Sequence, residues 1–121
     1  MLEKEQSKKY DLEERTFEFA RDVRAFARQL SRTLANIEDV KQLVRSSGSV
    51  GANYIEANES LGKKDFAMRA KICRKEAKES RYFLRLVFVD GNSALDKTRS
   101  SLIQEAVELT NIFGAIVRKT E

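Results

Sequence analysis

Apolar residues recur at steps of three and four over most of this chain, which is the spacing of one face of an α-helix. The first such stretch follows a polar segment, residues 1–10, which we expect to form an N-terminal tail. Asp11 and Glu14 then have the spacing of a capping box, which predicts a helix that begins at Asp11 and ends near Arg32. Its apolar stripe consists of Leu12, Phe19, Val23, Phe26 and Leu30.

A second helix is expected to begin near Asn36, since this residue or one of its neighbours can cap it. Two apolar rows lie side by side on this helix, and together they are wider than one seam of a helix bundle needs. Gly62 is expected to end the helix, because glycine adopts the left-handed conformation without a steric penalty. The first row is Val40, Leu43, Ser47, Val50, Tyr54, Ala57 and Leu61, and the second is Val44, Gly48, Gly51 and Ile55.

The third and fourth helices follow the same spacing. Asp65 can cap the third helix, and residues 90–93 (Asp-Gly-Asn-Ser) form a turn to the fourth. Short connections between helices of similar length favour antiparallel neighbours, so we predict an all-α, antiparallel up-down-up-down four-helix bundle, with residues 11–121 as a single domain. The third seam is Phe66, Ala70, Cys73, Ala77, Ser80, Leu84 and Val87, and the fourth is Leu95, Leu102, Ala106, Leu109, Phe113 and Ile116.

Small side chains are concentrated in the middle of the second and third helices. A glycine inside a helix costs about 1 kcal/mol relative to alanine, so two of them three residues apart indicate a packing requirement. Small residues let helix backbones approach closely, so we expect these positions to let the second and third helices pack tightly within one subunit, or to let a helix of another subunit lie near the bundle. We interpret Cys73 as a small buried hydrophobic residue rather than a nucleophile. The residues assigned to this helix-packing or oligomer contact are Ser47, Gly48, Gly51, Ala70, Cys73 and Ala77.

The composition limits the chemistry that the chain can support. Its 121 residues include no histidine, no proline and one cysteine. Without histidine the chain lacks the usual general base and the commonest metal ligand, which excludes Glu-x-x-His di-iron sites and ordinary zinc sites. One cysteine allows no internal disulfide, and no apolar run reaches membrane length. We therefore expect a cytoplasmic protein with no catalytic residues, no cofactor, no metal and no membrane contact.

Two Glu-x-x-Glu pairs, Glu56/Glu59 and Glu76/Glu79, leave one enzymatic alternative open. They resemble the Glu-x-x-Glu…Glu-x-x-Asp arrangement of all-α nucleotide pyrophosphohydrolases, in which carboxylates hold magnesium over a nucleoside triphosphate. Oxygen ligands alone suit magnesium. However, a hairpin that turns near Gly62 places Glu56 opposite residue 70, which leaves Glu76 about 9 Å farther along the helix axis. That offset argues against the magnesium site.

The net charge of +4 is distributed unevenly. Residues 63–85 contain nine basic and three acidic residues, a net charge of +6, which leaves −2 for the rest of the chain. Such a surface can bind a nucleic-acid backbone without regard to sequence, whereas many charged helices are simply solvated. The residues assigned to nucleic-acid binding are Lys63, Lys64, Lys71, Arg74, Lys75, Lys78, Arg81 and Arg85.

Three segments carry a family resemblance: residues 45–57 (RSSGSVGANYIEA), 64–66 (KDF) and 72–80 (ICRKEAKES). They resemble the small bacterial four-helix-bundle proteins encoded in intervening sequences of large-subunit ribosomal RNA genes. The accessory variability proteins of diversity-generating retroelements are similar. The resemblance implies a ring-shaped homo-oligomer, a homopentamer. In the retroelement branch it also implies a basic surface that engages nucleic acid and a reverse transcriptase.

Together these observations predict a non-enzymatic, oligomeric helical bundle that binds RNA or DNA through the basic face of the third helix. Two alternatives stay open: the magnesium-dependent nucleotide pyrophosphohydrolase, and an assembly scaffold for another protein.

Overall fold

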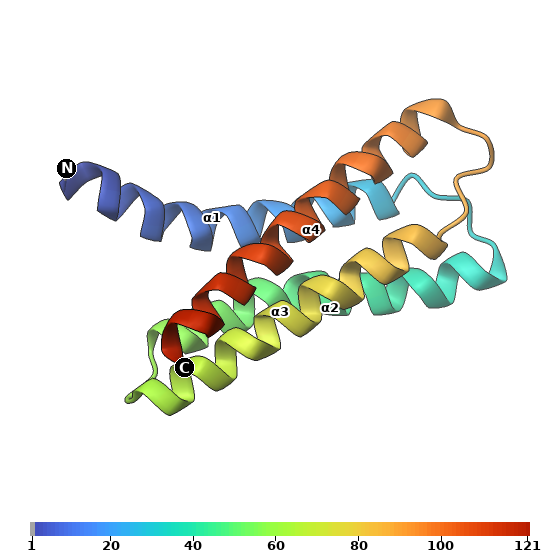
Figure 1. Cartoon of the computed structure of the whole chain (residues 1–121). Coiled ribbons are helices and arrows are strands. Elements are labelled where there is room, and N and C mark those ends of the chain that lie inside the picture. Colours follow the sequence, from blue (N-terminus) through green and yellow to red (C-terminus); the bar gives the residue numbers. More distant parts are fainter. Residues whose placement is uncertain (1) are drawn as a thin grey trace.

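The computed structural model describes the backbone of residues 2–121 and the side chains of residues 12–121. It contains four helices, α1 (Leu2–Ala27), α2 (Leu34–Asn58), α3 (Lys63–Leu86) and α4 (Ser93–Thr120), and no strand within that range. Consecutive helices run in opposite directions (Figure 1). The all-α, up-down-up-down four-helix bundle is therefore confirmed. Among residues 2–121, no helix combines the length and the apolar composition that a membrane span requires.

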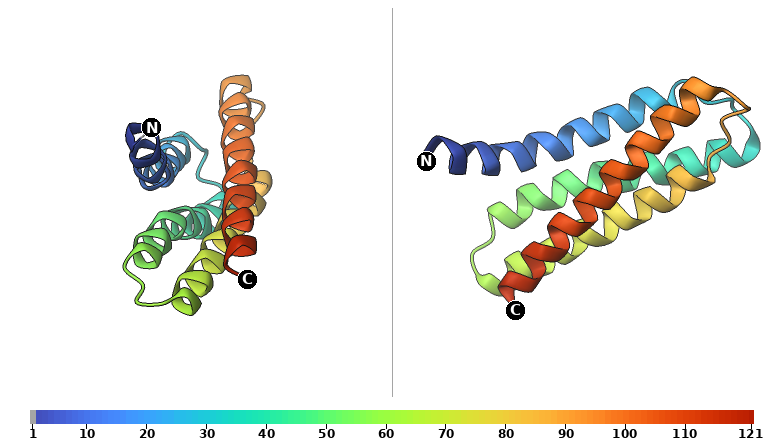
Figure 2. Two further views of the ribbon diagram at one scale, coloured as in Figure 1. Left: turned by 60° about the vertical axis from the view of Figure 1, so that its left-hand side comes forward. Right: turned by 45° about the horizontal axis from the view of Figure 1, so that its top comes forward.

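Each helix packs against its neighbours around a shared core. Figure 2 shows α1 beside α2 and diagonally across from α3, with α4 crossing α3 at an angle. Tyr54 of α2 meets Phe113 of α4 edge to face, with 5.7 Å between ring centroids. Side chains from all four predicted seams are buried, which confirms the helical spacing: they include Phe19, Val23, Phe26, Leu43, Val50, Ala70, Cys73, Ala77, Leu84, Leu102, Leu109 and Phe113.

Asn36 joins two loops at one end of the bundle. Its buried side-chain amide donates hydrogen bonds of 2.9 Å to the carbonyls of Ser31 and Phe88, and it accepts one of 2.9 Å from the Phe88 amide. The cap of α2 is its neighbour Thr33, whose hydroxyl oxygen accepts a 3.1 Å bond from the Asn36 amide. The connections before α2 and after α3 are thus held together by one side chain.

The turn between α3 and α4 lies where the sequence predicts it. Asp90 and Gly91 have positive φ angles of 53° and 67°, and the Asn92 side chain caps α4 by accepting a 3.0 Å bond from the Leu95 amide. Asparagine and aspartate tolerate the left-handed region better than most residues, and glycine adopts it freely.

Several predicted helix ends are wrong. Helix α1 begins at Leu2 rather than at Asp11, because residues 2–10 contain no glycine or proline to stop a helix from propagating. Helix α2 ends at Asn58, so Leu61 lies outside it and is fully exposed. Gly62 has an extended backbone (φ −156°) and precedes the first residue of α3, which leaves Asp65 inside the first turn rather than at the cap.

The small residues of α2 face two different neighbours. Toward α3, the buried hydroxyls of Ser46 and Ser80 lie 2.9 Å apart and share a hydrogen bond. Gly48 and Gly51 instead face α1, where an added Cβ at Gly51 would lie 2.9 Å from Thr16 Oγ1. The expectation that these two glycines pack against the third helix is therefore wrong. Helical spacing fixes the direction in which a residue points, but not the element that it meets.

Candidate nucleic-acid interface

The basic residues of α3 form a continuous surface, here called the basic face. At 100° per residue, the eight predicted residues occupy a sector of about 120° that adjoins the buried side of the helix. Seven of them are exposed and Arg74 is half-buried. The ninth basic residue of the segment, Arg69, points toward α2 and donates a 3.1 Å hydrogen bond to Asn53. The exposed residues of the basic face are Lys63, Lys64, Lys71, Lys75, Lys78, Arg81 and Arg85.

No residue of the basic face has a carboxylate oxygen within 4 Å in the part of the chain whose side chains are described. The acidic residues of α3 lie on its other flank. Arg45 of α2 binds Glu76 at 3.0 Å and also binds Glu79. The hydrogen bond that Arg45 donates to Glu79 raises the pKa of Arg45 despite some desolvation. These two carboxylates therefore do not neutralise the basic face.

Two acidic residues of the neighbouring helix α4 are also bound by an arginine of another helix. Arg15 of α1 makes two hydrogen bonds of 2.8 Å to Glu105 and a third of 3.0 Å to Glu108. The bonds to Glu105 raise the pKa of Arg15, and the bonds from Gln104 and Arg15 lower the pKa of Glu108. Because Arg15 of α1 and Arg45 of α2 bind these carboxylates, the carboxylates form no ion pair with the basic residues of α3.

The four carboxylates of the magnesium alternative do not come together. Arg45 occupies Glu76 and Glu79, whereas Glu56 lies eleven residues from Arg45 along α2, about 16 Å away. Glu56 and Glu59 instead line a depression with Asp65 beside the α2–α3 connection. Within the described side chains, no three acidic or cysteine residues are grouped so that they could hold a metal ion.

Comparison with known proteins gives the family. The sequence matches the family described as 23S rRNA-intervening sequence protein over residues 8–115. The chain belongs to this family. The match confirms the resemblance of the helix-two and helix-three segments to the intervening-sequence proteins. None of the curated proteins matches the sequence at a significant level.

A solved structure is similar to this protein. It is the crystal structure of a protein of unknown function from the S23 ribosomal protein family of Bacteroides thetaiotaomicron. The two chains are 26% identical with a TM-score of 0.75, and the match covers 87% of this chain and 96% of the other. The four-helix fold is thus shared between the two proteins along almost their whole lengths.

Two functional candidates do not follow from the charge of residues 63–85. Arg118 of α4 lies near Arg74 of α3, because both side chains approach Gly114. A Cβ added at Gly114 would lie 3.4 Å from Arg118 Nη1 and 3.8 Å from Arg74 Cδ. The exposed Arg118 therefore extends the basic face onto α4. The second functional candidate is Tyr82, which is 56% exposed. The sequence identifies Tyr82 as aromatic, but only the fold gives its exposure.

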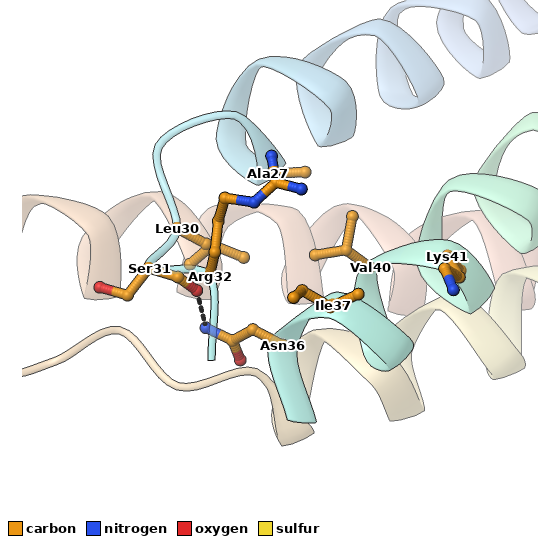
Figure 3. Close-up of a pocket in the computed structure, with 8 residues that line it drawn as sticks. All are labelled: Ala27, Leu30, Ser31, Arg32, Asn36, Ile37, Val40 and Lys41. Atoms are coloured by element: carbon orange, nitrogen blue, oxygen red, sulfur yellow. Dashed lines mark hydrogen bonds between the residues drawn. The ribbon is translucent and has the colours of Figure 1, made fainter. Parts of the chain in front are cut away.

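A shallow groove lies between α1 and α2 (Figure 3). Its volume is about 240 Å³, and Leu30, Ile37 and Val40 contribute apolar side chains to it, while Arg32 and Lys41 supply positive charge. Two further depressions continue along α1 as far as Phe17. The lining includes no carboxylate, thiol or imidazole.

Proposed function

We propose that this protein binds the phosphate backbone of RNA or DNA through the basic face of α3, as a homo-oligomer and without catalysing a reaction. The observation that carries the proposal is the row of basic side chains with no carboxylate partner among the described residues. Glu76 of α3 is bound by Arg45, and Glu105 of α4 is bound by Arg15.

The dimensions of the basic face suit an elongated polyanion. Lys63 and Arg85 are separated by about 33 Å along the helix axis. A protein that neutralises several phosphates releases condensed counterions, so its affinity falls steeply as the salt concentration rises. Such binding is independent of base sequence, and it agrees with a surface whose polar groups are almost all cationic.

Assembly would strengthen the contact. The family resemblance supports a ring, with five subunits as the proposed number, and several copies of the basic face on one assembly would bind a long polyanion with avidity. Phe17 of α1 and Ile55 of α2 are more than half exposed, which supports an apolar contact between subunits. Light scattering on the purified protein should give an oligomeric mass, and the mass of a monomer would contradict this part of the proposal.

The binding proposal is tested by removing four positive charges from α3. The variant combines Lys71→Gln, Arg74→Gln, Lys78→Gln and Arg81→Gln. Its matched control removes four exposed charges elsewhere, with Arg28→Gln, Arg32→Gln, Lys41→Gln and Lys97→Gln. Circular dichroism should confirm that both variants remain helical.

Fluorescence anisotropy with labelled RNA and DNA, between about 50 and 200 mM salt, gives the affinity and its salt dependence. We expect the α3 variant to bind more weakly, with a slope of log affinity against log salt that falls by about 0.7–0.9 for each lost phosphate contact. The control should bind like the unmodified protein. Equal affinities for the α3 variant and the unmodified protein at low salt would contradict the proposal. A specific protein partner without any nucleic-acid affinity would favour the scaffold instead.

A further inference from the structure

Tyr82 occupies a position in the basic face that the helical repeat would otherwise give to a cation. Four basic residues and Tyr82 follow one another at steps of four, three, four and three, the spacing of a single stripe on a helix. The stripe consists of Lys71, Lys75, Lys78, Tyr82 and Arg85.

The ring of Tyr82 is accessible and packs against a neighbouring ring. Its side chain is 56% exposed, and its ring meets that of Phe83 edge to face, with 5.2 Å between centroids and 85° between planes. Beyond it, Leu86 and Phe88 are also about half exposed, so an apolar surface continues past the end of the stripe. The basic face therefore combines cations with an aromatic surface.

We infer that the nucleic acid bound by the basic face is single-stranded and that one of its bases stacks on Tyr82. This inference rests on the proposed function, because it concerns the ligand of the same surface. An aromatic ring can stack only on a base whose flat face is free, and base pairing and stacking in a duplex cover those faces.

The geometry of the stripe supports the same ligand. Lys78 and Arg85 lie one helical turn on either side of Tyr82, about 5–6 Å away between Cβ atoms. Their cations can therefore reach the phosphates that flank a base stacked on the ring. A straight row of charges along one helix also suits a flexible strand, whereas the phosphates of a duplex curve away from a straight line.

The test compares single-stranded and duplex oligonucleotides of the same sequence and length, in RNA and in DNA. Tyr82→Ala should weaken binding to the single strand by about fivefold to a hundredfold, the range measured when a stacking aromatic is replaced by alanine. Its affinity for the duplex should not change. Tyr82→Phe keeps the ring and should retain the affinity. The matched control is Leu34→Ala, which removes an exposed apolar side chain (89%) from the first residue of α2.

A spectroscopic signal tests the stacking directly. The chain contains no tryptophan, so Tyr82→Trp introduces a single indole at the proposed site. Its emission should be quenched when the single strand binds, and a duplex should leave it unchanged. An indole signal that does not respond to either oligonucleotide would overturn the inference.

Three other results would also overturn it: equal affinity of Tyr82→Ala and the unmodified protein for the single strand, an equal loss for both oligonucleotides, or a changed oligomeric mass in Tyr82→Ala. None of these results contradicts the proposed function as long as the four-charge variant of α3 loses binding. If the unmodified protein binds no oligonucleotide at low salt, the proposed function and the inference are both wrong.

Discussion

Gly51 of α2 lies directly against Thr16 of α1. A Cβ built on Gly51 would be 2.9 Å from the Thr16 hydroxyl oxygen and 3.2 Å from the Thr16 Cβ. That hydroxyl is fixed by a 2.9 Å hydrogen bond to the Glu13 carbonyl, and threonine has few alternative rotamers in a helix. The close approach of α1 and α2 therefore depends on the absence of a side chain at position 51.

Gly51→Ala should destabilise the protein. Overpacking costs about 1–3 kcal/mol, which exceeds the gain of about 1 kcal/mol in helix propensity. Gly48→Ala is the matched control, because the nearest atom there belongs to the mobile end of Arg24, 3.1 Å away, and we expect a gain of about 0.5 kcal/mol. Urea unfolding at one protein concentration measures the change in the free energy of unfolding for both variants. Equal changes would contradict the proposed role of the Gly51–Thr16 contact. Thr16→Ala should partly rescue Gly51→Ala.

The contact of Arg45 with Glu76 predicts a stability effect that depends on burial. The Glu76 side chain is 8% exposed, so Arg45→Gln leaves a buried carboxylate without its partner and should lower the free energy of unfolding by about 1–3 kcal/mol. Arg21→Gln breaks an exposed pair with Asp22 and should change it by less than about 1 kcal/mol. Thermal unfolding compares the variants. Adding Glu76→Gln to Arg45→Gln should recover part of the loss, and no recovery would show that the buried carboxylate is not the cause.

Stability should fall in acid through Glu108. Its pKa lies below the ordinary value because Gln104 and Arg15 donate hydrogen bonds to the carboxylate. A carboxyl group whose pKa is lower in the folded state stabilises that state above its unfolded pKa, about 4.3. The stabilisation is lost as the pH falls through the folded pKa. Glu108→Gln, and to a lesser extent Gln104→Ala, should therefore flatten the decline of the melting temperature below about pH 4.5. Unchanged profiles in both variants would contradict this assignment.

Cys73 should be unreactive in the folded protein. Burial raises the pKa of its thiol to about 12, and only the thiolate reacts with iodoacetamide. At pH 8 we expect the folded protein to be alkylated at least about a hundredfold more slowly than the protein in denaturant, as measured by mass spectrometry. Equal rates would show that the α3 seam opens readily.

Arg118 should contribute to binding although it lies outside α3. Its guanidinium and the side chain of Arg74 both pass over Gly114, which places two cations on adjacent helices close to each other. Arg118→Gln should weaken nucleic-acid binding and reduce the salt slope by about 0.7–0.9, the effect of one phosphate contact. Lys97→Gln, near the opposite end of α4, is the matched control and should have no effect. If neither variant loses nucleic-acid affinity, the interface is restricted to α3.

The buried seams could be predicted because their information is local. Val23, Leu84 and Phe113 lie at helical steps from other apolar residues, and burying such a stripe is what stabilises a helix in a protein. The helix ends were less predictable. Asp11 and Gly62 have the residue types of caps, but a cap forms only where the chain changes direction, and the packing of the helices decides that position.

The four-helix fold and the charge of residues 63–85 were determined by the sequence alone, because helical spacing and composition carry them, and the family followed from the resemblance of three segments between residues 45 and 80. The pairing of surfaces was decided by the tertiary structure. Gly51 contacts Thr16. The acidic residues that could have neutralised α3 are bound by Arg45 and Arg15. Arg118 of α4 lies close to Arg74 of α3. These contacts link residues far apart in the chain, and helical spacing gives the direction of a side chain without naming its neighbour.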